Sequence, residues 1–273
     1  MRVVLLGLTG FGNEILPALL ADPAVEVPAI FTRSFPTPFP FYDIPQLHEL
    51  CRAVGVRCHD DLTVSEGPGL ETLRSYRPDL ILVAAFHQIL REPALSLPGL
   101  GVVNLHPSLL PEYKGADPLQ AALLDGAAET GITYHRMTAE VDTGDILLQA
   151  PYRMEPRETI ASLRLALARL GARHLPALLE DYKAGKVPAG RPQAGAGSSA
   201  RKRYRSPVPI ETGDPLDKID RLVRSVVPSP GATVEVRGTP RAVRGCEYVA
   251  AADPEGTGFL DLSRGGATLR LFL

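Results

Sequence analysis

The stretch VVNLHPSLLPEYKG, residues 102–115, begins with the apolar run of a buried strand and continues into polar and proline residues. Asn104 and His106 lie where the apolar run stops, and Pro107 follows directly. In an open parallel sheet, ligands bind beyond the carboxyl ends of the strands. Side chains two residues apart on an extended segment project to the same side. We therefore expect Asn104 and His106 to face one ligand together.

The apolar runs around this stretch predict the fold class. Short runs without alternation occur at 2–8, 25–32, 78–86 and 101–105, as expected of strands that are buried on both faces. Helical patterns separate these runs, and a long helical pattern follows at 158–185. Alternation of strands and helices is typical of right-handed crossovers in a parallel sheet. We predict an α/β fold with a Rossmann-like wound parallel sheet.

A change in composition predicts the domain organisation. Gly, Ala, Pro and Ser replace the hydrophobic periodicity over 186–208, which is typical of a linker. Residues 209–273 then show a helical pattern followed by short alternating runs that are separated by Gly-containing turns. We predict a catalytic domain over 1–185, a linker over 186–208 and a small helix plus β-barrel-like, OB-like domain over 209–273.

The overall composition excludes several classes of protein. Hydrophobic residues make up 45% of the 273 residues and the net charge is −2, which favours a globular chain without a general attraction to nucleic acid or anionic membranes. The three cysteines show neither disulfide-framework nor zinc spacing, which favours a reducing cytoplasm. Asn13-Glu14 interrupts the N-terminal apolar run before it reaches the length of a signal or membrane segment. We expect no membrane partner and no metal.

The glycine-rich loop GLTGFGNE, residues 7–14, does not fit a dinucleotide site. The fingerprint requires glycines at i, i+2 and i+5 and an acidic residue after the second strand. Counting from Gly10, the last position is Ile15, and the second apolar run ends in Phe31-Thr32-Arg33. These glycines therefore favour a tight turn over a bound pyrophosphate.

The stretch EVDTGDILLQ, residues 140–149, places Asp142 and Asp145 before another apolar run. Asp145 fits a turn-capping role. Near His106, Asp142 would orient the imidazole and favour its protonated form. An amide, an imidazole and a carboxylate without a neighbouring nucleophile predict oxyanion stabilisation during direct acyl-type transfer. The alternative is that Asn104 satisfies the loop backbone and His106 is a half-buried loop residue.

The ordered set NLHPSLLPEYKG, ETGITYHRM and DTGDILLQ resembles the signature of the tetrahydrofolate-dependent formyltransferases. This family includes glycinamide ribonucleotide, methionyl-tRNA and sugar amine N-formyltransferases. The resemblance implies that the formyl donor is 10-formyltetrahydrofolate and that no metal is needed. It also matches Asn104, His106 and Asp142 to the catalytic triad of the family. Asn104 would donate to the carbonyl oxygen, His106 as imidazolium would stabilise the oxyanion, and Asp142 would sustain that charge and assist proton removal through water.

The resemblance also implies a folate cleft formed by two segments of this chain. The matching cofactor-binding positions are Phe86, His87, Ile89, Leu90, Thr138, Ala139, Glu140 and Val141. We interpret His87 and His135, in or beside these segments, as packing or hydrogen-bonded residues instead of catalysts.

Two segments bear on the amine acceptor. The tRNA enzymes share a long basic insertion after the second strand, whereas residues 31–46 here are rich in aromatic residues and Pro, with Arg33 as the one cation. We therefore expect a small-molecule amine, above all a nucleotide-linked amino sugar, with a hydroxylated amino acid amine also open. The basic run RKRYR, 201–205, keeps methionyl-tRNA open. A non-catalytic folate-binding module and a homodimer paired through the small domain also stay open.

Overall fold

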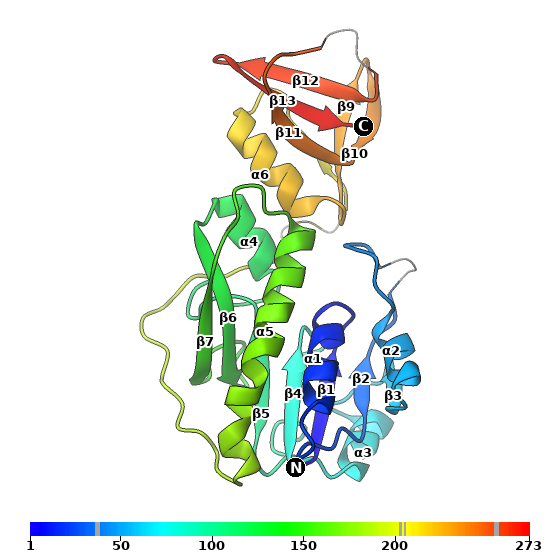
Figure 1. The fold of residues 1–273 in the computed structure, drawn as a ribbon, viewed down its shortest axis with the longest axis vertical. Coiled ribbons are helices and arrows are strands. Elements are labelled where there is room, and N and C mark those ends of the chain that lie inside the picture. The colour runs from blue at the N-terminus through cyan, green and yellow to red at the C-terminus, as the bar shows by residue number, and fades with distance from the viewer. Residues whose placement is uncertain (36–38, 202–203, 205, 254–256) are drawn as a thin grey trace. The chain divides into compact units, whose positions relative to one another are not determined.

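The computed structural model describes residues 1–35, 39–201, 204, 206–253 and 257–273 (Figure 1). The chain forms two compact units: unit 1 comprises Met1–Gly115, Glu129–Arg153 and Arg164–Ser199, and unit 2 comprises Ala116–Ala128, Met154–Leu163 and Ala200–Leu273. The segment 186–208 thus contributes residues 186–199 to unit 1 and the rest to unit 2. The domain boundaries at 185 and 208 stay predictions, which limited proteolysis would test.

Unit 1 is built on one seven-stranded sheet with the order β3-β2-β1-β4-β5-β6-β7. Its strands are β1 Val3–Gly7, β2 Ile30–Thr32, β3 Cys58–Asp60, β4 Leu80–Ala84, β5 Val102–His106, β6 Glu129–Arg136 and β7 Ile146–Arg153. Strands β1 to β5 pair in parallel, which confirms the predicted wound sheet. Strands β6 and β7 are antiparallel to their neighbours. A short loop can join antiparallel strands without a crossover helix, and no helix intervenes between β6 and β7.

Helices cover both faces of this sheet. The helices of unit 1 are α1 Phe11–Leu20, α2 Leu47–Ala53, α3 Gly67–Ser75 and, from Arg164 on, α5 Ile160–Lys183, whereas α4 Pro118–Asp125 belongs to unit 2. α1 and α5 lie on one face (Figure 1), where Glu14 pairs with Arg169 at 3.6 Å. Leu73 of α3 belongs to the apolar cluster that includes Val4 and Ile81, so α3 covers the opposite face. None of the helices in the described ranges is long and apolar enough to cross a membrane.

Unit 2 contains a small β domain, as predicted. Its further elements are β8 Val208–Pro209, α6 Leu216–Val226, β9 Ala232–Val236, β10 Thr239–Val243, β11 Gly245–Val249, β12 Phe259–Arg264 and β13 Ala267–Phe272. The strands form two three-stranded sheets, β10-β9-β8 and β11-β13-β12. Ile219 and Val223 of α6 pack in one buried cluster with Leu269 and Leu271 of β13. This cluster gives the unit its own hydrophobic core.

Candidate active site

The register of β5 and β6 brings the predicted residues of β5 to a second histidine. Asn104 lies opposite His135, and His106 lies opposite Thr133. Directly opposite residues of an antiparallel pair project from the same face of the sheet. His135 is therefore a neighbour of Asn104, which agrees with its interpretation as a hydrogen-bonded residue. The position of His135 beside the Asn104 amide depends on the register of β5 against β6, which a local sequence pattern does not reveal.

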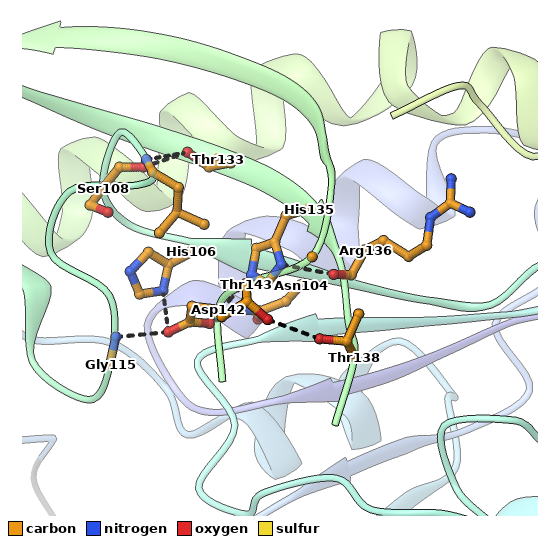
Figure 2. Close-up of polar contacts among 12 residues, drawn as sticks. Asn104, His106, Ser108, Gly115, Thr133, His135, Arg136, Thr138, Asp142 and Thr143 are labelled. Carbon is orange, nitrogen blue, oxygen red and sulfur yellow. Dashed lines mark hydrogen bonds and ion pairs between the residues drawn. The ribbon is translucent and has the colours of Figure 1, made fainter. Parts of the chain in front are cut away.

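Asp142 lies between two imidazoles (Figure 2). Its Oδ2 is 3.5 Å from Nδ1 of His106, and its Oδ1 is 3.4 Å from Nε2 of His135. Oδ2 also accepts the backbone N–H of Gly115 at 2.8 Å. The three side chains are at most 9% exposed. The structure thus brings Asp142 and His106 together as the sequence predicts, in a site shielded from bulk water.

The hydrogen-bond partners determine where the protons lie. Nε2 of His106 donates to the carbonyl oxygen of Tyr113 at 2.9 Å, and Nδ1 of His135 donates to the carbonyl oxygen of Arg136 at 3.0 Å. A carbonyl oxygen only accepts, so both of these nitrogens carry a proton. In each neutral ring the other nitrogen, which faces Asp142, is then without a proton.

The Asn104 amide completes this network. Its Nδ2 donates to Nε2 of His135 at 3.1 Å and approaches Oδ1 of Asp142 at 3.4 Å. A carboxylate only accepts, so the amide must turn its NH₂ group toward Asp142. The amide therefore has two N–H groups that can donate here, and its contact with Asp142 is longer than its contact with His135.

Burial and charge act in opposite directions on the pKa values of this site. Burial lowers the pKa of His106 by more than Asp142 and the Tyr113 carbonyl raise it, so the imidazole is neutral at pH 7. Burial raises the pKa of Asp142, but its contacts with the His135 and His106 rings and with the Gly115 N–H together hold it below its usual range. Asp142 favours protonation of His106 as predicted, yet burial leaves the free site with a neutral imidazole and a carboxylate.

The conformation of the loop that carries Asp142 is fixed by its own backbone and by hydrogen bonds from another segment. Asp142 has a φ of 54°, in the left-handed region that few non-glycine residues adopt. A Cβ on Gly144 would lie 1.9 Å from the carbonyl oxygen of Arg136, so only glycine fits there. The side chain of Gln193 donates to the carbonyl oxygens of Asp142 and Gly144 at 2.8 and 2.9 Å. The predicted linker therefore supplies a residue that supports the site.

The turn after β5 is also fixed by side chains. The Thr133 hydroxyl donates to the carbonyl oxygen of Ser108 at 2.7 Å and accepts the N–H of Leu110 at 3.0 Å. The Tyr113 N–H donates to the Ser198 hydroxyl at 2.9 Å. These bonds position the backbone groups that contact His106 and Asp142.

The predicted folate positions lie on two segments of unit 1. Leu90 is buried, whereas Ile89 is 63% exposed and Val141 is 53% exposed. Thr138, Ala139 and Glu140 are also exposed. Phe86 packs against the apolar cluster that contains Leu90. His87 is half-buried and its Nδ1 has no hydrogen-bond partner. The contacts of these residues with the folate donor stay predictions.

The comparisons with known proteins agree with this geometry. Residues 65–179 match the Formyl transferase family. A methionyl-tRNA formyltransferase from Roseiflexus sp. (strain RS-1) is 33% identical over 98% of this chain and 83% of its own length. This chain belongs to the formyltransferase family. A second member, a methionyl-tRNA formyltransferase from Halorhodospira halophila, is 33% identical over 99% of this chain and 90% of its own.

A solved member of the family shares the fold. The sugar 3N-formyl transferase WlaRD covers 100% of this chain and 97% of its own length with a TM-score of 0.71 and 14% identity. Because the chain belongs to the formyltransferase family, it is an enzyme that transfers a formyl group, and its donor is 10-formyltetrahydrofolate. Family membership favours this over a non-catalytic folate-binding module. Within the described residues, no group of three or more His, Cys, Asp or Glu side chains could hold a metal ion.

Proposed function

We propose that this enzyme transfers the formyl group to the amino group of methionine that is esterified to tRNA. The observation that supports this acceptor is the identity of 33% to methionyl-tRNA formyltransferases over 98% and 99% of the chain. The matched length includes the small β domain as well as the catalytic site. This support favours the tRNA alternative over the small acceptor expected from residues 31–46.

Asn104, His106 and Asp142 carry the reaction in this proposal. The bound donor supplies an electrophilic formyl carbon that an amine attacks directly. Asn104 can donate to the oxyanion that develops when its N–H releases the 3.4 Å contact with Asp142. Such a donor is most effective in a buried site, where water does not screen it.

His106 acts first as a base in this proposal. Its imidazole is neutral in the free site and its Nδ1 faces Asp142 at 3.5 Å. It can therefore accept the proton that the attacking amine loses, directly or through water. The imidazolium that results is stabilised by Asp142 and in turn stabilises the oxyanion. His106 thus becomes cationic during the reaction, and as an imidazolium it stabilises the oxyanion, which is the role that the family resemblance implies.

A small amine is the second candidate, because the β2–α2 loop is aromatic. Phe39 lies 5.4 Å from Phe35 and 5.3 Å from Tyr42, measured between ring centroids. Arg33, the one cation of residues 31–46, lies over the Phe35 ring at 5.9 Å. Such a loop offers little charge to neutralise phosphates. Residues 36–38 of this loop, and 202, 203 and 205 of the basic run, lie outside the described residues.

An acceptor panel tests the proposal. Release of tetrahydrofolate from 10-formyltetrahydrofolate is followed by absorbance with methionyl-tRNA, nucleotide-linked amino sugars and free amino acid amines. We expect kcat/KM for methionyl-tRNA to exceed that for each small amine by roughly 100-fold or more. Deacylated tRNA, which lacks the amine, should compete without turnover. Turnover confined to an amino sugar nucleotide would instead identify the aromatic loop as the acceptor site of a small-molecule enzyme.

A further inference from the structure

A segment that follows α5 in the chain contacts both loops of the candidate site. Residues 191–199, here called the strap, belong to unit 1. The backbones of Arg191 and Ile146 exchange two hydrogen bonds of 2.8 Å at the start of β7. In the turn after β5, the N–H of Lys114 donates to the carbonyl oxygen of Ser198 at 2.9 Å. The strap is therefore held near both of its ends.

Gln193 of the strap contacts the Asp142 loop with its side chain. Its Nε2 donates to the carbonyl oxygens of Asp142 and Gly144 at 2.8 and 2.9 Å. Because carbonyl oxygens only accept, the NH₂ group of this amide must face the loop. Its Oε1 is buried and has no hydrogen-bond partner among the described residues. Within the part of the chain that the structure describes, the polar contacts of this side chain are thus the two bonds to the loop.

These two bonds act on the backbone that directs the Asp142 side chain. Asp142 has a φ of 54°, which costs a non-glycine residue free energy and persists where the surroundings enforce it. The ψ angle of a residue sets the direction of its carbonyl group, so a bond that holds the Asp142 carbonyl also holds this angle. The bond to Gly144 fixes the backbone two residues further on. Gln193 therefore opposes relaxation of Asp142 to an ordinary backbone conformation.

The contacts of the Asp142 carboxylate depend on this conformation (Figure 2). Its oxygens lie 3.5 Å from Nδ1 of His106 and 3.4 Å from Nε2 of His135, at the long end of the hydrogen-bond range. A further displacement would end both contacts. A misplacement of about 1 Å in a catalytic group can cost on the order of 10²-fold in rate.

We propose that Gln193 is a positioning residue for formyl transfer, which holds Asp142 in its left-handed conformation and so keeps the carboxylate between His106 and His135. This proposal rests on the proposed roles of Asp142 and His106, but not on which amine accepts the formyl group. Gln193 acts through the backbone of Asp142 and exchanges no proton with the substrate.

Gln193→Met tests the two bonds, because methionine has a similar length but donates no hydrogen bond. We expect kcat at saturating folate donor to fall on the order of 10²-fold. Arg191→Met is the matched control on the strap, since it removes a bond of 2.8 Å to the Gln149 side chain and leaves the Asp142 loop untouched. Its kcat should stay near the wild-type value. An equal loss in both variants would contradict a specific role of Gln193.

A double-mutant cycle separates positioning from a general structural role. If Gln193 acts through Asp142, Gln193→Met should lower kcat in the wild type but cause no further loss in Asp142→Asn. Equal fold losses in the two backgrounds would show that Gln193 acts independently of Asp142, and the proposal would then be wrong.

A crystal structure of Gln193→Met tests the proposal without an acceptor. We expect Asp142 to leave the left-handed region and its carboxylate to move away from at least one imidazole. An unchanged Asp142 would overturn the proposal, whichever amine is the acceptor. Absence of wild-type turnover with methionyl-tRNA would contradict only the proposed acceptor, and the kinetic comparison would then use the amine that the acceptor panel identifies.

A second variant keeps the test independent of the folding of the first. Gln193→Glu has the same length and places carboxylate oxygens, which cannot donate, against the two carbonyl oxygens. We expect the same loss of kcat and the same displacement of Asp142. Thermal melting beside the wild type shows that each variant is folded, and a folded Gln193→Glu with wild-type kcat would refute the proposal.

Discussion

Asp142 in unit 1 and Asp220 in unit 2 are both shielded aspartates that lie among cations or groups that can become cationic, and the two differ in their partners. The Asp142 side chain is 9% exposed in unit 1 and lies 3.4 and 3.5 Å from two imidazoles. The Asp220 side chain is 8% exposed in unit 2 and lies 2.6 Å from Arg157 and 2.8 Å from Arg224. In both cases the partners hold the aspartate pKa below its usual range despite burial.

The difference in partners separates a chemical role from a structural one. A guanidinium keeps its charge at every accessible pH and cannot exchange a proton with a substrate. Arg157 also donates to the carbonyl oxygen of Cys246 at 2.7 Å, and Arg224 donates to that of Glu158 at 2.7 Å. Asp220 thus fastens the Met154–Leu163 segment to α6 within unit 2. An imidazole can gain and lose a proton near neutral pH, so the Asp142 cluster can support proton transfer.

The largest expected effect follows from removing the charge of Asp142. Asp142→Asn keeps the shape of the side chain but no longer stabilises an imidazolium at His106. We expect kcat to fall on the order of 10⁴-fold, as for other carboxylates that orient a catalytic histidine. Single-turnover formyl transfer measures this loss. Asp145→Asn in the same loop is the control and should stay within about tenfold of the wild type; an equal loss in both variants would point to a disrupted loop.

The matching change in unit 2 should affect stability. Asp220→Asn leaves two guanidinium groups without their carboxylate, and we expect the free energy of unfolding to fall by about 3–5 kcal/mol. Chemical denaturation measures this value. Asp217→Asn on the same helix removes an exposed pair with Arg221, at 2.9 Å, and should cost about 0.5 kcal/mol or less. Equal losses for the two variants would contradict the structural role of Asp220.

Asn104→Ala removes the proposed oxyanion donor. We expect kcat to fall on the order of 10²–10³-fold, while the protein folds and binds the folate donor. Stopped-flow assays of formyl transfer and calorimetric binding of the folate separate these two properties. Near-normal turnover would remove Asn104 from the mechanism.

The smallest expected effect is on the pH dependence of stability. Burial holds the pKa of His106 below its ordinary 6.5, so the unfolded chain binds more protons as the pH falls through 6.5 and the folded state loses stability there. The pKa of Asp220 lies below 3.8, so its contribution is lost only below pH 3.8. The free energy of unfolding should therefore decrease between about pH 7.5 and about pH 5.5, and it should decrease less in His106→Gln. Identical slopes would refute burial as the cause.

Local patterns predicted much of the fold and the identity of the three central residues. Uninterrupted apolar runs indicated the parallel strands, and Asn104 and His106 stand where one such run ends. The prediction missed β3, because its three residues are half-buried or exposed and form no apolar run. It also missed the antiparallel direction of β6 and β7, because the apolar content of a strand does not encode its direction.

The sequence by itself indicated the family and the reaction class and singled out Asn104, His106 and Asp142 as candidates, because these depend on residue types in a fixed order. Only the tertiary structure decided that His135 lies opposite Asn104, that Gln193 supports the Asp142 loop and that His106 is neutral in the free site. Strand register, long-range hydrogen bonds and burial arise from segments far apart in the chain. For that physical reason the sequence indicates which side chains form this site, whereas the fold determines their protonation states and the hydrogen bonds that support them.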